Sequence, residues 1–354
     1  MALTNKVKEK IAIEVIRTLV TRFDNFPEDA SSNRNAPFHE AFLLAFSEKL
    51  KENVSNIPFF ISLSSWMHGL NTTLGQTFFE NVAHHLSQGE KREYTSKRLG
   101  NLPITQTQRD NISQIIADLS TSTNTPDLDS ENQLLFINSD TTTINAMDFS
   151  ADVFIEDTNS ITAIELKSVK PNSGEMKGEK QKILEGKAAL FRKFPGKHIH
   201  FYIGFPFDPT VNVGSELVTS FDKIRFLGQI INMNKFFAPN ETLIASELWD
   251  TLSGVTNTME EILGIINAIS TTEFLSKYNL LIDNSNRNNH AYKDILDEWY
   301  LTSELELIEN NELLKENIGN DRSLNRNYNK TAFNSKGEYN MDRYIELKEH
   351  IANR

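Results

Sequence analysis

The stretch Ser150-Ala-Asp-Val-Phe-Ile-Glu-Asp-Thr-Asn-Ser-Ile-Thr-Ala-Ile-Glu-Leu-Lys167 decides the fold, because it predicts two short β-strands around a polar turn. The first strand is expected at Asp152–Ile155 and the second at Ile161–Val169, where apolar and β-branched side chains suited to a buried strand pair are concentrated. Residues 157–160 between them are Asp, Thr, Asn and Ser, which favour turns. The sequence therefore predicts a β-hairpin.

Folding this hairpin brings three charged side chains onto one face. With the turn centred between residues 158 and 159, the antiparallel register places Asp152 opposite Glu165. Lys167 shares their face because strand side chains alternate with a period of two. Two carboxylates and an ammonium group make a site for a hard divalent cation, with the lysine beside it to hold a water or offset negative charge. The alternative is a structural cluster at the rim of a sheet, although burying such charges without a function is costly.

The order of these residues resembles the PD-(D/E)xK nuclease motif, in which a lone Asp precedes a Glu-x-Lys on the neighbouring strand. Asp152, Glu165 and Lys167 match the motif, and Ala151 stands in the place of its proline. The resemblance implies a restriction-endonuclease-like α/β core that hydrolyses phosphodiesters.

Glu80 is a further candidate for the same site. Its neighbours Phe79, Val82 and Ala83 are expected to face a core, which is an awkward place for an idle carboxylate. Nucleases of the PD-(D/E)xK type often carry such a glutamate on the helix before the hairpin, pointing at the metal. The alternative is a glutamate on an exposed helix surface.

The net charge of −12 argues at first against a nucleic-acid partner, because phosphate contacts need lysine and arginine. Between residues 165 and 197, however, nine basic residues stand against four acidic ones. We expect this segment to grip a phosphodiester substrate through Lys170, Lys177 and Lys180, although a solvated helix face would look the same. Arg322 and Arg326, in a tail that mixes basic and aromatic residues, are further candidates for DNA contact.

Two more acidic residues, Glu175 and Glu179, lie on the helix expected after the hairpin. Either could add a metal ligand or pair with a neighbouring lysine on that helix. We favour the salt-bridge interpretation.

Composition indicates a soluble protein. The 354 residues include 39% apolar ones, enough for one large domain or two ordinary ones. Absence of cysteine excludes disulfides and thiolate metal sites and suits a reducing cytoplasm. The longest run without Asp, Glu, Lys or Arg, residues 56–79, contains too many polar residues for a membrane span.

The coarse pattern predicts an α/β core with a mixed central β-sheet flanked by helices, plus helical additions at both termini. We expect an N-terminal helical segment at 1–64, the nuclease core at 65–235, and a mainly helical region for DNA recognition and dimerisation at 236–354. Helices are expected over 5–23, 38–52, 77–86, 106–119 and 175–193, a strand over 199–205, a loop over 120–130, and helical periodicity over 246–269 and 292–314.

Longer blocks of the chain resemble the TdeIII-type family of type II restriction endonucleases. These blocks are Asn35–Ala41, Ser65–Glu80, Gln88–Glu93 and Ala163–Leu184. The resemblance implies Mg²⁺-dependent cleavage of double-stranded DNA at a short palindrome of the GGNCC kind by a homodimer, with a cognate DNA methyltransferase as functional partner.

With that chemistry, Asp152, Glu165 and the Leu166 carbonyl are expected to hold Mg²⁺, while Lys167 positions the attacking water. Two alternatives stay open at this stage. One is a nuclease of repair or recombination without strict sequence preference, and the other is a catalytically silent DNA-binding module.

Overall fold

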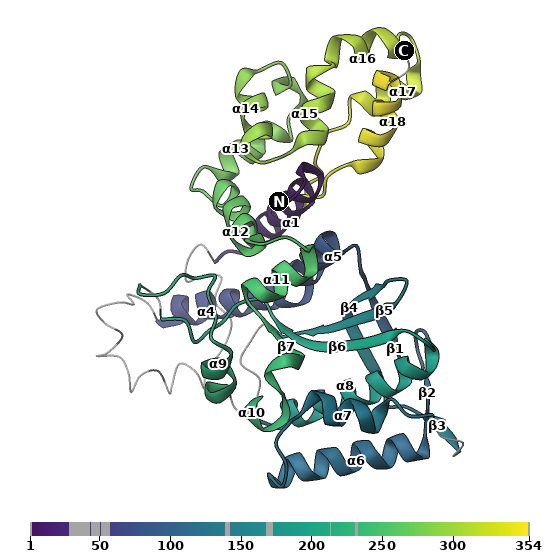
Figure 1. The fold of residues 1–354 in the computed structure, drawn as a ribbon. Helices are drawn as coiled ribbons and strands as arrows, with labels where there is room; N and C mark the ends of the chain where they lie inside the picture. Colours follow the sequence, from purple (N-terminus) through teal and green to yellow (C-terminus); the bar gives the residue numbers. More distant parts are fainter. Residues whose placement is uncertain are drawn as a thin grey trace. The chain divides into compact units, whose positions relative to one another are not determined.

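The computed structural model describes residues 2–27, 43, 50, 57–138, 142–167, 173–212, 214–230 and 233–352. The chain divides into two compact units (Figure 1). Unit 1 comprises residues 1–3 and 79–261, and unit 2 comprises residues 4–78 and 262–354. The boundaries of these units differ from those of the three segments expected from the sequence. The roles assigned to those segments stay predictions. Of the helix expected over 38–52 the structure describes only residues 43 and 50, so this helix stays a prediction.

Unit 1 is built on a five-stranded sheet with the strand order β1-β4-β5-β6-β7. The first three strands pair antiparallel, whereas β5, β6 and β7 pair parallel, so the sheet is mixed. This confirms the predicted fold class. The strands are β1 Glu90–Tyr94, β4 Phe149–Glu156, β5 Ser160–Leu166, β6 His198–Phe205 and β7 Thr242–Ile244.

Helices cover both faces of this sheet (Figure 1). α8 packs on β4 and β6 and is joined by α6 and α7 on the same side, while α5 packs on β4 and on α11. A small separate sheet pairs β2, Pro103–Thr105, with β3, Thr143–Asn145. The helices are α5 Phe79–Ser87, α6 Gln106–Thr121, α7 Leu128–Leu135, α8 Ser173–Lys193, α9 Lys223–Gln229, α10 Met233–Phe236 and α11 Ser246–Ser253.

The decisive hairpin has the register that the sequence predicts. Val153 pairs with Ile164, and the Asp157 N–H donates to the Ser160 carbonyl across the turn at 3.0 Å. Continuing that pairing by one residue sets Asp152 opposite Glu165. β4 begins earlier than expected, at Phe149, and β5 ends at Leu166.

The buried face of α8 lies unusually close to the sheet at Gly186. A Cβ there would stand 2.6 Å from the ring of Phe201, closer than real Cβ atoms approach a neighbour, and 3.0 Å from that of Phe149, which is already tight. Glycine is therefore required for α8 to rest on β4 and β6 at this point. Because α8 is one continuous helix, this contact also fixes where its N-terminal half lies.

Unit 2 is helical. The uncharged run that begins near residue 56 forms α4, which the sequence patterns did not predict, and a π-helix at Leu74–Phe78 follows it. None of the helices among the described residues is both long and apolar enough to cross a bilayer. The helices of this unit are α1 Asn5–Phe23, α4 Ile57–Thr73, most of α12 Thr258–Ile269, α13 Phe274–Leu281, α14 His290–Glu298, α15 Thr302–Glu309, α16 Asn311–Ile318, α17 Arg322–Tyr328 and α18 Met341–Ala352.

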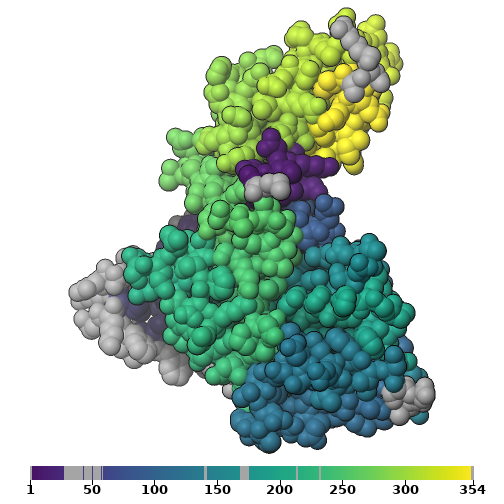
Figure 2. Space-filling model, viewed as in Figure 1, coloured from purple at the N-terminus to yellow at the C-terminus, as the bar shows by residue number. Residues whose placement is uncertain are grey.

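The basic and aromatic C-terminal segment is a folded part of unit 2. α18 packs on α15, α16 and α17, and the space-filling view shows this segment, in yellow, lying directly against its neighbours (Figure 2). Arg343 is buried and makes two hydrogen bonds to the Glu304 carboxylate, at 2.6 and 3.2 Å. A small apolar core lies beside this pair and comprises Leu307, Leu314, Ile318 and Leu347.

Candidate active site

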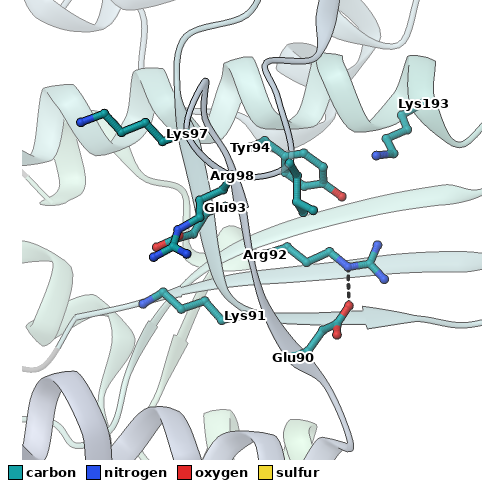
Figure 3. A pocket seen from close by; sticks show the side chains of 9 residues that line it. Glu90, Lys91, Arg92, Glu93, Tyr94, Lys97, Arg98 and Lys193 are labelled. Carbon is teal, nitrogen blue, oxygen red and sulfur yellow. Dashed lines mark hydrogen bonds and ion pairs between the residues drawn. The ribbon is translucent and has the colours of Figure 1, made fainter.

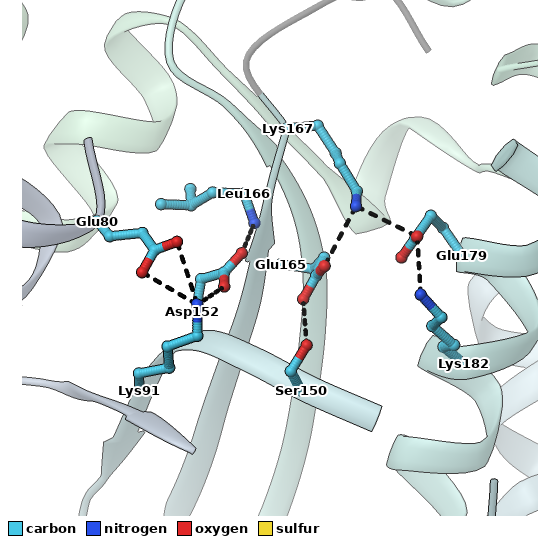
Figure 4. Close-up of polar contacts among 9 residues, drawn as sticks. All are labelled: Glu80, Lys91, Ser150, Asp152, Glu165, Leu166, Lys167, Glu179 and Lys182. Carbon is cyan, nitrogen blue, oxygen red and sulfur yellow. Dashed lines mark hydrogen bonds and ion pairs between the residues drawn. The ribbon is translucent and has the colours of Figure 1, made fainter. Parts of the chain in front are cut away.

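Asp152 is held at the open end of the hairpin by two neighbouring elements (Figure 4). Its Oδ2 accepts a hydrogen bond from the Leu166 backbone N–H at 2.9 Å, which ties β4 to the end of β5. Its Oδ1 lies 3.0 Å from Nζ of Lys91, on β1. The side chain is almost fully buried, so both carboxylate oxygens depend on these partners.

Glu165 and Lys167 come together on the same face, as the sequence predicts. Lys167 Nζ lies 3.2 Å from Glu165 Oε1 and 3.2 Å from Oε1 of Glu179, on α8. The hydroxyl of Ser150 donates to the other oxygen of Glu165 at 3.2 Å. Glu179 also pairs with Lys182 on its own helix at 3.1 Å, so the expected salt bridge forms, but it extends to Lys167 as well.

Glu80 reaches the same cluster from α5 through Lys91. The Lys91 ammonium donates to both oxygens of Glu80, at 3.2 and 3.1 Å, while it also contacts Asp152. One lysine thus bridges two of the carboxylates that the sequence assigns to the site. Glu80 is neither idle nor on an exposed helix surface, because its side chain is only 15% exposed.

Electrostatics of the cluster reflect a surplus of buried carboxylates. Burial, followed by the negative charge of Asp152, raises the pKa of Glu165 to about 7, even though Lys167 opposes the shift. Burial and then Asp152 also raise the pKa of Glu80. Burial alone would lower the pKa of Lys91, but Asp152 and Glu80 outweigh it and raise that pKa, so the ammonium stays charged.

These residues fit a hard divalent cation. Carboxylate oxygens are the ligands that such ions prefer, and two ammonium groups already stand between the carboxylates, where positive charge is favourable. Glu179 Oε2 is buried with no hydrogen-bond partner in the described part of the chain, which leaves one oxygen available. Within the described ranges no three acidic or histidine side chains converge closely enough to form a preassembled metal centre, because the lysines separate them.

The predicted DNA contacts are placed very differently from one another. Lys180 is fully buried, and its ammonium binds Glu131 at 2.7 Å and Glu241 at 2.5 Å, so it has no surface to offer a phosphate. The prediction that Lys180 contacts DNA is therefore wrong, because counting basic residues along the segment does not distinguish a buried lysine from an exposed one. Lys177 is exposed, as are the two candidates of α17, Arg322 and Arg326. Lys170 lies outside the described residues.

Sequence reasoning missed Lys91 altogether. β1 was not expected to be a strand, because Glu90-Lys-Arg-Glu-Tyr94 carries four charges in five residues. The block Gln88–Glu93 entered the argument only as part of a family resemblance. A signal was nevertheless present, since a charged strand that alternates faces can present Lys91 to one side of a sheet.

The mixed sheet, with carboxylates and lysines meeting at the end of its hairpin, defines the class as a restriction-endonuclease-like α/β core. Comparison with known proteins gives the family. A family model described as "Type II restriction endonuclease, HinfI" matches residues 3–270. The chain belongs to this HinfI-type family and is a type II site-specific deoxyribonuclease.

A similar curated protein is the type II restriction enzyme MjaII of Methanocaldococcus jannaschii. The two are 41% identical over 369 residues, an alignment that covers 99% of this chain and 98% of that protein. The comparisons confirm the predicted class, a type II restriction endonuclease. They also exclude a silent DNA-binding module as the best description of the chain.

Proposed function

We propose that this restriction endonuclease is of the PD-(D/E)xK type, with Asp152, Glu165 and Lys167 as its three motif residues. The observation that carries the proposal is the hairpin register. In this register Asp152 lies opposite Glu165, and the alternation of side chains along the chain brings Lys167 to within 3.2 Å of Glu165 on the same face. A Mg²⁺ ion is the proposed cofactor, held by Asp152, Glu165 and the Leu166 carbonyl, and it would supply Lewis-acid stabilisation of the scissile phosphate.

Side chains of the protein position the attacking water and the metal-binding carboxylates. Lys167 is oriented by two carboxylates, Glu165 and Glu179, so its ammonium can hold the attacking water and offset the charge that develops on the phosphate. Ser150 fixes the far oxygen of Glu165 and so limits the rotation of that carboxylate. Glu80 acts beside Asp152, to which Lys91 links it.

Several finer properties are proposed on the resemblance to the TdeIII type. They are a target of the GGNCC kind, a homodimer whose twofold axis matches that of the DNA, and a cognate methyltransferase that protects the host genome. A cytoplasmic location is proposed separately, on the absence of cysteine. The similarity to MjaII, a type II restriction enzyme, supports the cleavage of double-stranded DNA. Lys177, Arg322 and Arg326 stay candidates for backbone contacts.

A digest tests the activity and the site together. The purified protein with Mg²⁺ should cut phage DNA into discrete bands, whose mapped ends reveal whether the target is GGNCC. Glu165→Ala and Asp152→Ala should abolish cleavage while retaining fold and DNA binding. Asp148→Ala is the matched control, because Asp148 is exposed, precedes β4 and bonds Asn101. Cleavage by Glu165→Ala, or loss of cleavage in the control, would overturn the assignment.

A further inference from the structure

We propose that β1 and the turn after it form the surface that holds the sugar–phosphate backbone of the cleaved strand as it enters the active site. The surface is an open hollow of about 860 Å³ lined by residues 90–94, 97–99 and Lys193, called here the β1 hollow (Figure 3). The inference rests on the proposed nuclease function and locates its DNA grip.

Charge is the first reason. The β1 hollow is lined by five basic residues and two acidic ones, a net charge of +3 in a chain whose total is −12. An acidic protein must bind DNA through local positive surfaces, because phosphate contacts depend on lysine and arginine. The basic residues that line the hollow are Lys91, Arg92, Lys97, Arg98 and Lys193.

Availability is the second reason. Lys97 is exposed and has no ion pair or hydrogen-bond partner anywhere in the described ranges. Arg98 is 71% exposed, and its ion pair is with Glu93 at 3.0 Å. Such an exposed pair contributes little to stability, so the guanidinium can turn to a phosphate at small cost. By contrast, the Arg92 guanidinium lies 3.9 Å from the centre of the Phe154 ring and also pairs with Glu90. These two contacts hold Arg92 in place, so it lines the hollow but is not free to turn to a phosphate.

Continuity with the active site is the third reason. Lys91 lines the hollow, and its ammonium contacts Asp152, a proposed metal ligand, and Glu80, so this one side chain links the hollow to the proposed active site. β1 is also the first strand of the sheet order, and its outer edge has no strand beside it among the described residues. Backbone N–H groups along such an edge are donors of the kind that fix a phosphate backbone in register.

The experiment compares three double substitutions that remove the same charge. They are Lys97→Ala/Arg98→Ala in the β1 hollow, Arg322→Ala/Arg326→Ala on α17, and Lys6→Ala/Lys293→Ala at exposed lysines of unit 2 as the matched control. Affinity for a cognate and a mismatched duplex is measured from low to high salt with Ca²⁺ in place of Mg²⁺. All six side chains are exposed, so the melting temperatures should not change.

We expect Lys97→Ala/Arg98→Ala to lower the log–log salt slope by about 2, since each lost phosphate contact removes about 1. Its affinity should fall by the same factor on both duplexes, because backbone contacts position the DNA without reading bases. The control should keep the wild-type slope. A wild-type slope in Lys97→Ala/Arg98→Ala, or an equal loss in the control, would overturn the inference.

The two proposals fail in different ways. If the β1 hollow is not the grip, the wild-type enzyme still cuts DNA into discrete bands, and the slope falls only in Arg322→Ala/Arg326→Ala. If the proposed active site is wrong, Glu165→Ala cleaves DNA whatever the salt slopes are.

Discussion

Replacing Lys91 by methionine is the most direct probe of the site, because one ammonium group holds two of its carboxylates. Lys91 makes three contacts of 3.0 to 3.2 Å, two to Glu80 and one to Asp152. Methionine keeps most of the aliphatic stem and removes the charge. Without metal, Glu80 and Asp152 are then left facing each other in a poorly solvated site, where burial and, after it, the charge of Asp152 already raise the pKa of Glu80.

The expected cost follows from the burial of the three groups. A hydrogen bond to a charged group contributes about 1.5–3 kcal/mol when it is buried. The Lys91 side chain is 37% exposed, so solvent screening reduces this figure, whereas Glu80 and Asp152 are only 15% and 10% exposed. We therefore expect a loss of roughly 2 kcal/mol of unfolding free energy in EDTA. For a unit of this size that corresponds to a fall of about 4–8 °C in Tm.

Metal should reverse the loss. In the wild-type protein a cation has to displace the Lys91 ammonium from the carboxylates of Glu80 and Asp152. In Lys91→Met no ammonium competes with the cation there. Because a ligand that binds only the folded state stabilises it by RT ln(1 + [L]/Kd), tighter binding gives a larger stabilisation, and the Tm gain on adding Mg²⁺ should be larger in the variant. Melting curves with EDTA and with Mg²⁺, and titration calorimetry with Ca²⁺, measure both effects.

Lys97→Met is the matched stability control, since Lys97 is exposed in the same unit and has no ion pair to lose within the part of the chain that the structure describes. Its Tm should equal that of the wild type under both conditions. An unchanged Tm of Lys91→Met in EDTA would show that the bridge does not stabilise the site. An equal Mg²⁺ gain in both proteins would show that Lys91 keeps its place when the metal binds.

Further predictions concern pH and the basic residues of α8. The folded pKa of Glu165 is about 7 against an ordinary value of 4.5, so the folded protein binds more protons between these limits. Metal-free stability should therefore fall as pH rises from 4.5 to 7, while the affinity for Mg²⁺ should rise over the same interval, because the metal binds the deprotonated carboxylate. A flat profile between pH 5 and 7 would exclude a titrating Glu165. Lys180→Met should lose about 3–5 kcal/mol in urea unfolding, because Glu131 and Glu241 lose their buried partner, whereas Lys177→Met should change stability by less than about 0.5 kcal/mol. Equal stabilities for these two variants would refute the buried network.

The hairpin could be predicted because everything that determines it lies within eighteen consecutive residues. The polar turn fixes the loop, the apolar residues fix which face is buried, and a period of two then places Asp152, Glu165 and Lys167 together. α1, α6 and α8 were predicted for the same local reason, since their apolar periodicity is contained in each helix. α4 was not predicted, because its uncharged, Thr- and Ser-containing sequence shows no such periodicity.

The contacts that complete the site could not be predicted, because they join segments far apart in the chain. Lys91 meets Asp152 only once β1 pairs with β4, and 54 residues separate the end of β1 from the start of β4. Nothing in Glu90–Tyr94 specifies that partner. A short, charged edge strand has few side-chain packing interactions of its own, so its position depends on the strand beside it.

The error at Lys180 shows what a count of charges along a helix leaves out. Glu179 and Lys180 are neighbours on α8, and adjacent helical side chains point about 100° apart. Glu179 therefore meets Lys167 in the active site, while Lys180 points into the core toward Glu131 and Glu241. Part of the positive charge of this segment therefore lies in buried ion pairs that hold α8 against its neighbours. That anchoring keeps Glu179, and through it Lys167, at a fixed distance from the hairpin, so a fully buried lysine can still determine the geometry of the proposed catalytic residues.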